Sequence, residues 1–167
     1  MLRSENDLSR TISGGIIAGL AAAALLTLMM TVMSAVRGAD IWFGMKGAAA
    51  PFLGERAMQP GFDFFAVWLG LLCHAAVSVA WAVPFVLLAD HLSPLATVGA
   101  GAAWGLVVWI GMFYVLLPLF GLGDMRHDAP LSRAILYHVF FGVAVALAYL
   151  GYQRSEHRLR GRAFAHA

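Results

Sequence analysis

Charged side chains are scarce in this chain, and long stretches contain none. Only 12% of the 167 residues are Asp, Glu, Lys or Arg, against roughly 25% in an ordinary soluble domain. Four stretches lack these residues completely: 11–36, 64–89, 92–123 and 134–153. Because a bilayer core of about 30 Å needs roughly 20 apolar residues in a helix, each stretch is long enough to cross it. The scarcity of charge excludes a water-soluble fold and predicts a membrane protein.

Other absences restrict the activity. A single cysteine, Cys73, excludes an intrachain disulfide. The chain has no phosphate-binding loop, dinucleotide fingerprint or nucleophile motif. No carboxylate lies inside an apolar stretch, where a proton-coupled pump usually needs one. These absences favour a protein without enzyme activity. The short run of arginines near the end is also too little to indicate a nucleic-acid partner.

The apolar stretches predict an all-α integral membrane four-helix bundle. They are continuous and rich in Ala, Leu and Gly, whereas the strands of a membrane barrel are short and alternate between apolar and polar residues. We expect one membrane domain over residues 1–167, with spans at about 11–36, 64–89, 95–121 and 132–152. A basic tail over 154–167 follows, and we expect it to be partly disordered.

A faint internal repeat relates the first two spans to the last two. The matched positions are two glycines in spans one and three and a histidine in spans two and four: Gly15 with Gly101, Gly19 with Gly105, and His74 with His138. Each unit would be a two-helix hairpin, so both would cross the bilayer in the same direction. Such a duplication is a parallel repeat, unlike the inverted repeats common in secondary transporters.

Lys and Arg residues near the ends of spans predict the orientation. The side that holds both termini carries Arg3, Arg10, Arg154, Arg158, Arg160 and Arg162. The opposite side carries Arg37, Lys46, Arg56, Arg126 and Arg133. The counts are nearly even, but the four arginines directly behind the last span are the strongest local signal, so we place both termini in the cytoplasm. There the basic tail is attracted to anionic lipid, and the bilayer is the first expected partner.

The only long linker, residues 37–63, combines apolar residues with several helix breakers. We expect it to lie at the membrane surface, with Trp42 at the level of the headgroups and with Lys46 and Arg56 facing water. A re-entrant loop that dips into the bundle is the alternative.

Small residues follow one face of the first span, at Gly15, Ala18, Gly19 and Ala22. The pair in the third span, Gly101 and Gly105, has the same spacing. Small residues one turn apart let helix backbones approach closely in lipid. Packing within the chain is the simpler interpretation. The alternative is a contact face for a homo-oligomer or a larger membrane complex.

Polar side chains cluster toward the outer half of the predicted bundle. They are Thr27, Thr31, Ser34, Ser78 and Tyr114, together with the two histidines. Because polar groups in hydrocarbon are costly, they tend to face a bundle interior or a cavity. The spacing therefore predicts a polar chamber in the outer half and a dry inner half.

His74 and His138 lie at similar predicted depths and have three interpretations. They are core polar groups satisfied by a neighbouring hydroxyl or carbonyl, or the axial ligands of one b-type haem, or part of a metal site. In the third case His127, with Asp124 or Asp128, completes a site for Zn or Cu. Met29, Met30 and Met33 also suggest copper, but neighbouring methionines point to different faces, and core filling is the simpler explanation.

The chain resembles small four-span bacterial inner-membrane proteins with no assigned function. The features that carry the resemblance are a Gly- and Ala-rich opening over 14–20, prolines in the linker, His74, the pair Trp109 and Met112 with Leu117-Pro118-Leu119, and His138 with Gly142. The resemblance implies a bacterial multi-pass protein and no catalytic residue. We therefore expect a non-enzymatic accessory or partner-binding component. The alternatives are an electron-transfer protein that uses His74 and His138 to hold haem or metal, and a small channel or carrier that uses the polar chamber.

Overall fold

The computed structural model describes residues 5–127 and 130–165, and within these ranges it contains helices, turns and coil but no strand. The long helices are α1 (Glu5–Val36), α5 (Phe64–Ala89), α6 (Pro94–Ile110) and α8 (Leu131–Ala165). The linker between α1 and α5 forms α2 (Phe43–Gly47), α3 (Ala50–Leu53) and α4 (Glu55–Met58). A π-helix, η1 (Gly111–Leu116), and α7 (Leu117–Leu119) continue α6, and the 3-10 helix η2 (Gly123–His127) precedes α8. The predicted all-α class, the four-helix bundle and the four apolar spans are confirmed.

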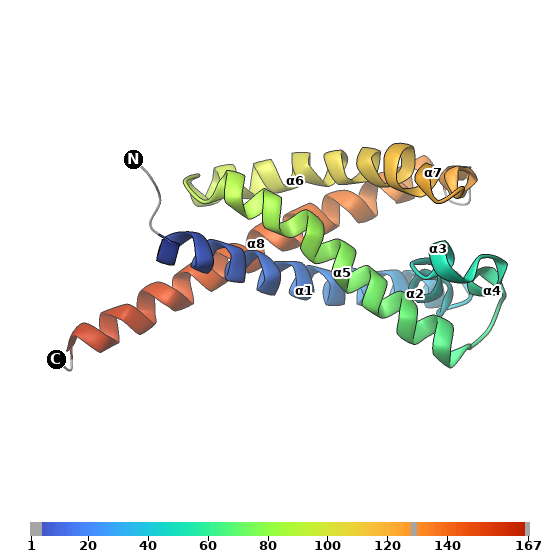
Figure 1. Cartoon of the computed structure of the whole chain (residues 1–167), viewed down its shortest axis with the longest axis horizontal. Coiled ribbons are helices and arrows are strands. Elements are labelled where there is room, and N and C mark those ends of the chain that lie inside the picture. Colours follow the sequence, from blue (N-terminus) through green and yellow to red (C-terminus); the bar gives the residue numbers. More distant parts are fainter. Residues whose placement is uncertain (1–4, 128–129, 166–167) are drawn as a thin grey trace.

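The two helices at the centre of the bundle are α1 and α8. α5 packs along α1, α6 packs along α8, and α1 contacts α8 (Figure 1). α5 and α6 meet at their connecting turn and diverge from there. That turn, the start of α1 and the end of α8 share one end of the bundle, which we call the terminal end. The opposite end, the loop end, holds α2, α3, α4 and α7.

Apolar side chains cover the outside of this bundle, while its centre is built from small ones. Ala18, Ala22 and Ala146 are fully buried in the core. In contrast, Leu28 is 60% exposed and Leu95 is 85% exposed. Soluble monomers rarely expose apolar patches of such extent, whereas lipid accepts them, so the surface is that of a membrane-embedded protein.

The predicted small-residue faces pack within the chain. A Cβ added at Gly19 would lie 2.8 Å from Cα of Val79 on α5. In the other hairpin, a Cβ at Gly101 would lie 2.5 Å from the carbonyl oxygen of Gly142 on α8, and one at Gly105 would collide with the carbonyl of His138. The backbones of α6 and α8 therefore touch, and the simpler of the two interpretations of these glycines holds for the described fold.

The two hairpins use their glycines in registers that differ by one helical turn. Gly19 meets the carbonyl of Ser78, which is four residues beyond His74. In the second hairpin the equivalent carbonyl is that of Gly142, four residues beyond His138, and the glycine that meets it is Gly101. The repeat pairs Gly101 with Gly15 and not with Gly19, which lies one turn later. If the hairpins arose by duplication, one pair has since slid by a turn.

Local sequence explains where the long helices begin and bend. Asp63 caps α5 by accepting a 3.0 Å hydrogen bond from the Ala66 N–H, and Ser93 caps α6 in the same way at 3.4 Å. Pro118 follows the π-helix η1, in keeping with the lost N–H and the steric clash that a proline imposes on the preceding turn. Pro84, in contrast, lies inside α5 without ending it.

The basic segment after the fourth span differs from the expectation of partial disorder. α8 continues without a break from the span to Ala165. Helix formation is favoured because a long helix needs only one nucleation step and because this segment contains good helix formers such as Arg and Ala. The helix therefore projects past the start of α1 at the terminal end (Figure 1).

Candidate functional site

A small void lies between α1, α2 and α5, and three of the residues predicted for the polar chamber line it. It is lined by Thr27, Met30 and Thr31 of α1, by Gly44 and Met45 of α2, and by Leu71 and His74 of α5. The centre of a water-sized sphere can occupy about 10 Å³ of it, enough for roughly one water molecule. Such a volume holds a single small ligand and does not form a path through the bundle.

His74, one of the residues that line this void, has an unused ring nitrogen. Its imidazole is hydrogen-bonded to the backbone of Ala23 on α1, but its Nε2 atom is buried and has no hydrogen-bond partner among the described residues. The bond to Ala23 therefore uses the other nitrogen, Nδ1, and the Nε2 lone pair remains available. A ring fixed by a carbonyl at one nitrogen and open at the other is the arrangement in which histidine ligates metals.

His138 lies near enough to His74 for the charge of one to act on the other. Its Nδ1 lies 2.7 Å from the carbonyl oxygen of Ala134, one turn earlier in α8, and its ring meets the edge of Phe113 at 5.6 Å. The neighbouring hydroxyl of Tyr137 is the second buried polar atom without a partner in the part of the chain that the structure describes. The fold thus brings the two histidines near each other. A shared haem remains a prediction.

The other residues predicted for the chamber do not share one environment. Thr31 donates a 2.9 Å hydrogen bond to the carbonyl of Thr27 within α1, and Ser78 is buried beside Gly19. Ser34 lies nearer the end of α1, where its carbonyl accepts hydrogen bonds from the turn that follows. Tyr114 does not belong to the chamber, because it is 53% exposed and stacks edge-on against Trp109. The expectation that Tyr114 lines the chamber is wrong because the π-helix of η1 sets a rotation that regular helical spacing does not describe.

The predicted metal set near η2 is only partly visible. His127 and Asp124 are exposed, and Nε2 of His127 lies 3.0 Å from Nε of Arg126, which donates to it. Asp128 lies outside the described residues. Among the residues that are described, no three His, Cys, Asp or Glu side chains gather as metal ligands. The geometry therefore gives this set no support.

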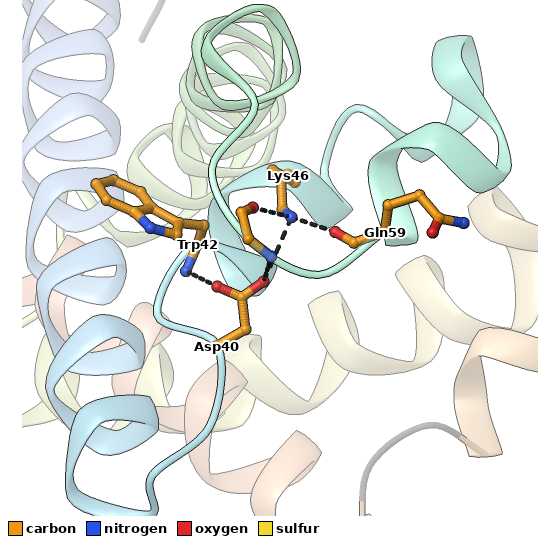
Figure 2. A network of polar contacts seen from close by, with 5 residues as sticks. Asp40, Trp42, Lys46 and Gln59 are labelled. Carbon is orange, nitrogen blue, oxygen red and sulfur yellow. Dashed lines mark hydrogen bonds and ion pairs between the residues drawn. The ribbon is translucent and has the colours of Figure 1, made fainter.

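A buried lysine that the sequence analysis placed in water is the most tightly bound polar group of the loop end. Lys46 is 1% exposed. Its ammonium contacts the carboxylate of Asp40 at 3.3 Å and donates to the backbone carbonyls of Gln59 and Gly61 (Figure 2). The prediction that Lys46 faces water is wrong, because three acceptors within the linker replace its hydration.

Asp40 connects two segments of the linker to this ammonium. It accepts 2.9 Å hydrogen bonds from the N–H groups of Trp42 and Gly61. Burial opposes ionisation of its carboxyl, but these two donors and Lys46 outweigh burial and lower the pKa of Asp40 from its ordinary value of 3.8. The cluster of Asp40, Lys46, Gln59 and Gly61, which we call the lysine network, closes the linker on itself.

A second ion pair lies beside the lysine network, at the start of α5. Arg56 donates to Asp63 through Nε at 2.8 Å and through an Nη atom at 3.2 Å. This contact, followed by the Ala66 N–H, lowers the pKa of Asp63 to about 2. Arg56 is largely exposed, as predicted.

The terminal end contains a carboxylate network that sequence reasoning treated only as a span boundary. Asp90 accepts hydrogen bonds from the hydroxyl of Tyr149, from Nε2 of Gln153 at 3.1 Å and from Thr11 at 3.4 Å. Thr11 and Tyr149 are 5% and 2% exposed. We call these four residues the aspartate network. Polar residues inside the first and fourth apolar stretches, and a carboxylate directly after the second, were the available signal, but spacing alone does not reveal partners on different helices.

Comparisons of this chain with protein-family models, with curated proteins and with solved structures find no match.

Proposed function

We propose that this chain is a non-enzymatic, multi-pass protein of a bacterial inner membrane that binds a transmembrane helix of another protein along α6. The observation that carries the proposal is the unequal burial of the spans. Only 11% of the most apolar window of the third span is buried by the rest of the chain, against 44% for the fourth. The third span is thus the least covered part of the bundle.

The uncovered face of α6 is suited to a helix of another protein. α6 packs mainly on α8, because α5 diverges from it (Figure 1). Leu106, Ile110 and Tyr114 are 41%, 50% and 53% exposed, and aromatic residues are enriched where protein interfaces bury surface. The π-helix η1 adds an irregular ridge to this face, and π-helical turns are frequent at functional sites.

The placement of two charged groups, one buried and one half-buried, supports a binding protein over an enzyme. Lys46 and Asp90 each satisfy structural partners within the chain. Groups held in this way stabilise a fold and are poorly placed to exchange protons with a substrate. Lipid is the competing occupant of the α6 face, and the experiment below separates the two.

Site-specific photo-crosslinking in cells tests this assignment. A photoreactive amino acid replaces Leu106 or Ile110 on α6. In matched controls it replaces Leu20 or Leu28 on α1, which are 48% and 60% exposed. We expect a discrete protein adduct from the α6 positions and lipid adducts alone from α1. Lipid adducts from all four positions, without a protein adduct from α6, would refute the proposal. An adduct formed with another copy of this chain would show that the α6 face binds a second copy and not another protein.

The proposed orientation, with both termini in the cytoplasm, rests on the arginines behind the fourth span. A C-terminal fusion to a fluorescent protein that matures only in the cytoplasm tests it, beside a fusion to a phosphatase that is active only outside. We expect fluorescence without phosphatase activity. The reverse result would place the terminal end outside.

A further inference from the structure

We infer that the void between α1, α2 and α5 is a site for a soft monovalent metal ion, with Cu(I) as the physiological candidate. The ligands are Nε2 of His74 and the thioether sulfurs of Met30 and Met45. All three residues line the same void, and each comes from a different helix. This inference does not depend on the proposed binding of a partner to α6, which lies on the other side of α8 from α1.

The first argument is the unused nitrogen of His74. A buried polar atom without a partner is costly, and more so inside a membrane protein, where water is not at hand to compensate. The hydrogen bond from the ring to Ala23 holds the imidazole in place. Nε2 then has no hydrogen-bond partner among the residues that the structure describes. A metal ion in the void would use this lone pair, and Ala23 would act as the outer-shell group that orients a metal-binding histidine.

The second argument is the close approach of α2, which brings Met45 to the void. A Cβ at Gly70 on α5 would collide with the backbone carbonyl of Met45, so α2 lies directly on α5 one turn before His74. A Cβ at Gly44 would lie 2.6 Å from the methyl carbon of Met30. The two glycines therefore let α2 lie close to α1 and α5, and Met30, Met45 and His74 line the void between these helices.

The third argument is the chemistry of the lining. Thioethers are soft ligands that select Cu(I), and imidazole also binds copper. Zinc favours thiolates, imidazoles and carboxylates in a tetrahedral set, and this void offers one imidazole and no carboxylate or thiolate among its lining residues. Because the three ligands are neutral, the site keeps only the single positive charge of Cu(I). A divalent ion with the same ligands would bring twice that charge into the apolar interior. Lys46 follows Met45 in sequence, but its ammonium is bound to Asp40 and to two carbonyls.

The sequence pattern does not reveal this set. Met29, Met30 and Met33 are close along α1, yet only Met30 lines the void. Its partners lie 15 and 44 residues further along the chain, at positions 45 and 74.

Titration of the purified full chain with Cu(I) in detergent tests the site, under anaerobic conditions and against a chromogenic Cu(I) chelator. We expect one Cu(I) per chain, no retained zinc, and X-ray absorption that shows nitrogen and sulfur neighbours. Met30→Leu and Met45→Leu conserve side-chain volume and remove the sulfur. Each should weaken Cu(I) binding at least about tenfold, as the loss of even an outer-shell partner does, and their combination should remove the sulfur signal.

Met29→Leu is the matched control, because Met29 precedes Met30 and packs against the core without lining the void. This variant should bind Cu(I) like the unmodified chain. His74→Gln should abolish binding, and the two methionine variants keep the test valid if that variant does not fold. The inference is overturned if the unmodified chain does not compete with the chelator, or if bound copper lacks sulfur neighbours. It is also overturned if Met29→Leu weakens binding as much as Met30→Leu and Met45→Leu do.

Discussion

The two ends of the bundle each contain a charged group bound by several partners, Lys46 buried and Asp90 half-buried, but they hold it in different ways. At the loop end, the lysine network pairs an ammonium with a carboxylate and two carbonyls, all from the linker between α1 and α5. At the terminal end, the aspartate network binds a carboxylate through donors that include the side chains of Thr11 on α1 and of Tyr149 and Gln153 on α8. One network is local in sequence, and the other joins segments that are distant in sequence.

This difference separates two tasks. The lysine network shapes a loop, because Lys46 lies 6 to 15 residues from its acceptors. The aspartate network fastens helices to one another, because Asp90 lies 59 to 79 residues from its donors. Loss of the first should open the linker and leave the spans in place, whereas loss of the second should loosen the packing of α1, α5 and α8.

Removal of the carboxylate at the loop end should have the largest effect. Asp40→Ala leaves the ammonium of Lys46 buried without its counter-ion, and breaking a buried pair in this way costs about 3 to 5 kcal/mol. Lys46 is the only lysine of the chain, so its reaction with an amine-specific reagent reports opening of the linker. The labelling rate at Lys46, followed by mass spectrometry, should rise by at least about a hundredfold.

Asp63→Ala is the matched control for that experiment, since Asp63 is a carboxylate of the same segment that pairs with Arg56. It should leave the labelling of Lys46 nearly unchanged. Rapid labelling of Lys46 in the unmodified chain would contradict the lysine network itself.

At the terminal end, Tyr149→Phe should have an intermediate effect on global stability. It removes one donor to Asp90, which keeps Thr11 and Gln153, and a hydrogen bond to a charged group contributes about 1.5 to 3 kcal/mol. The free energy of unfolding, measured by titration with a denaturing detergent, should fall by that amount without faster labelling of Lys46. Tyr114→Phe should leave stability unchanged, because Tyr114 is largely exposed. Equal effects of the two substitutions would contradict the aspartate network.

Acid should open the loop end, and Asp40, which is the counter-ion of the buried Lys46, carries most of this effect. The pKa of Asp40 is lowered, and that of Asp63 lies at about 2, against an ordinary value of 3.8. A carboxyl whose pKa is lower in the folded state adds stability above its unfolded pKa, and this stability is lost as the pH falls through the folded value. Pepsin should therefore spare residues 37–63 at about pH 5 and cut them near about pH 2. Cleavage of the unmodified chain already at about pH 5 would contradict this mechanism.

Arg56→Gln should have the smallest effect. Arg56 is 56% exposed on its side chain, and exposed ion pairs contribute little because water and salt screen them. Labelling of Lys46 should change by less than about twofold. A rise comparable to that of Asp40→Ala would show that the two ion pairs of the linker act as one unit.

The architecture was predictable because it follows from composition along the chain. Runs without charge, such as 64–89, are long enough to span lipid, and the structure places α5 at Phe64–Ala89. The close packing of small residues was also predictable, since Gly101 and Gly105 have the spacing that brings backbones together. The end of the last helix was not, because α8 continues through the drop in hydropathy after residue 153, and that continuation depends on helix propensity.

The polar sites were predictable only in part. Spacing placed Thr27, Thr31 and His74 on compatible faces, and all three line the void. It failed for Tyr114, where the π-helix rotates the chain, and for Lys46, whose acceptors come from a folded linker. The aspartate network was missed for the same reason, since a partner such as Tyr149 lies on another helix.

Sequence by itself determined that this chain crosses a membrane four times as helices, because the cost of placing backbone and charge in hydrocarbon depends only on local composition and length. Tertiary structure alone decided which polar groups are satisfied. It buried Lys46 among carbonyls, linked Asp90 to two other helices, and left Nε2 of His74 without a hydrogen-bond partner among the described residues. Those outcomes depend on how closely the helices approach one another and how they are rotated. The positions of the glycines permit a close approach but do not specify the rotation.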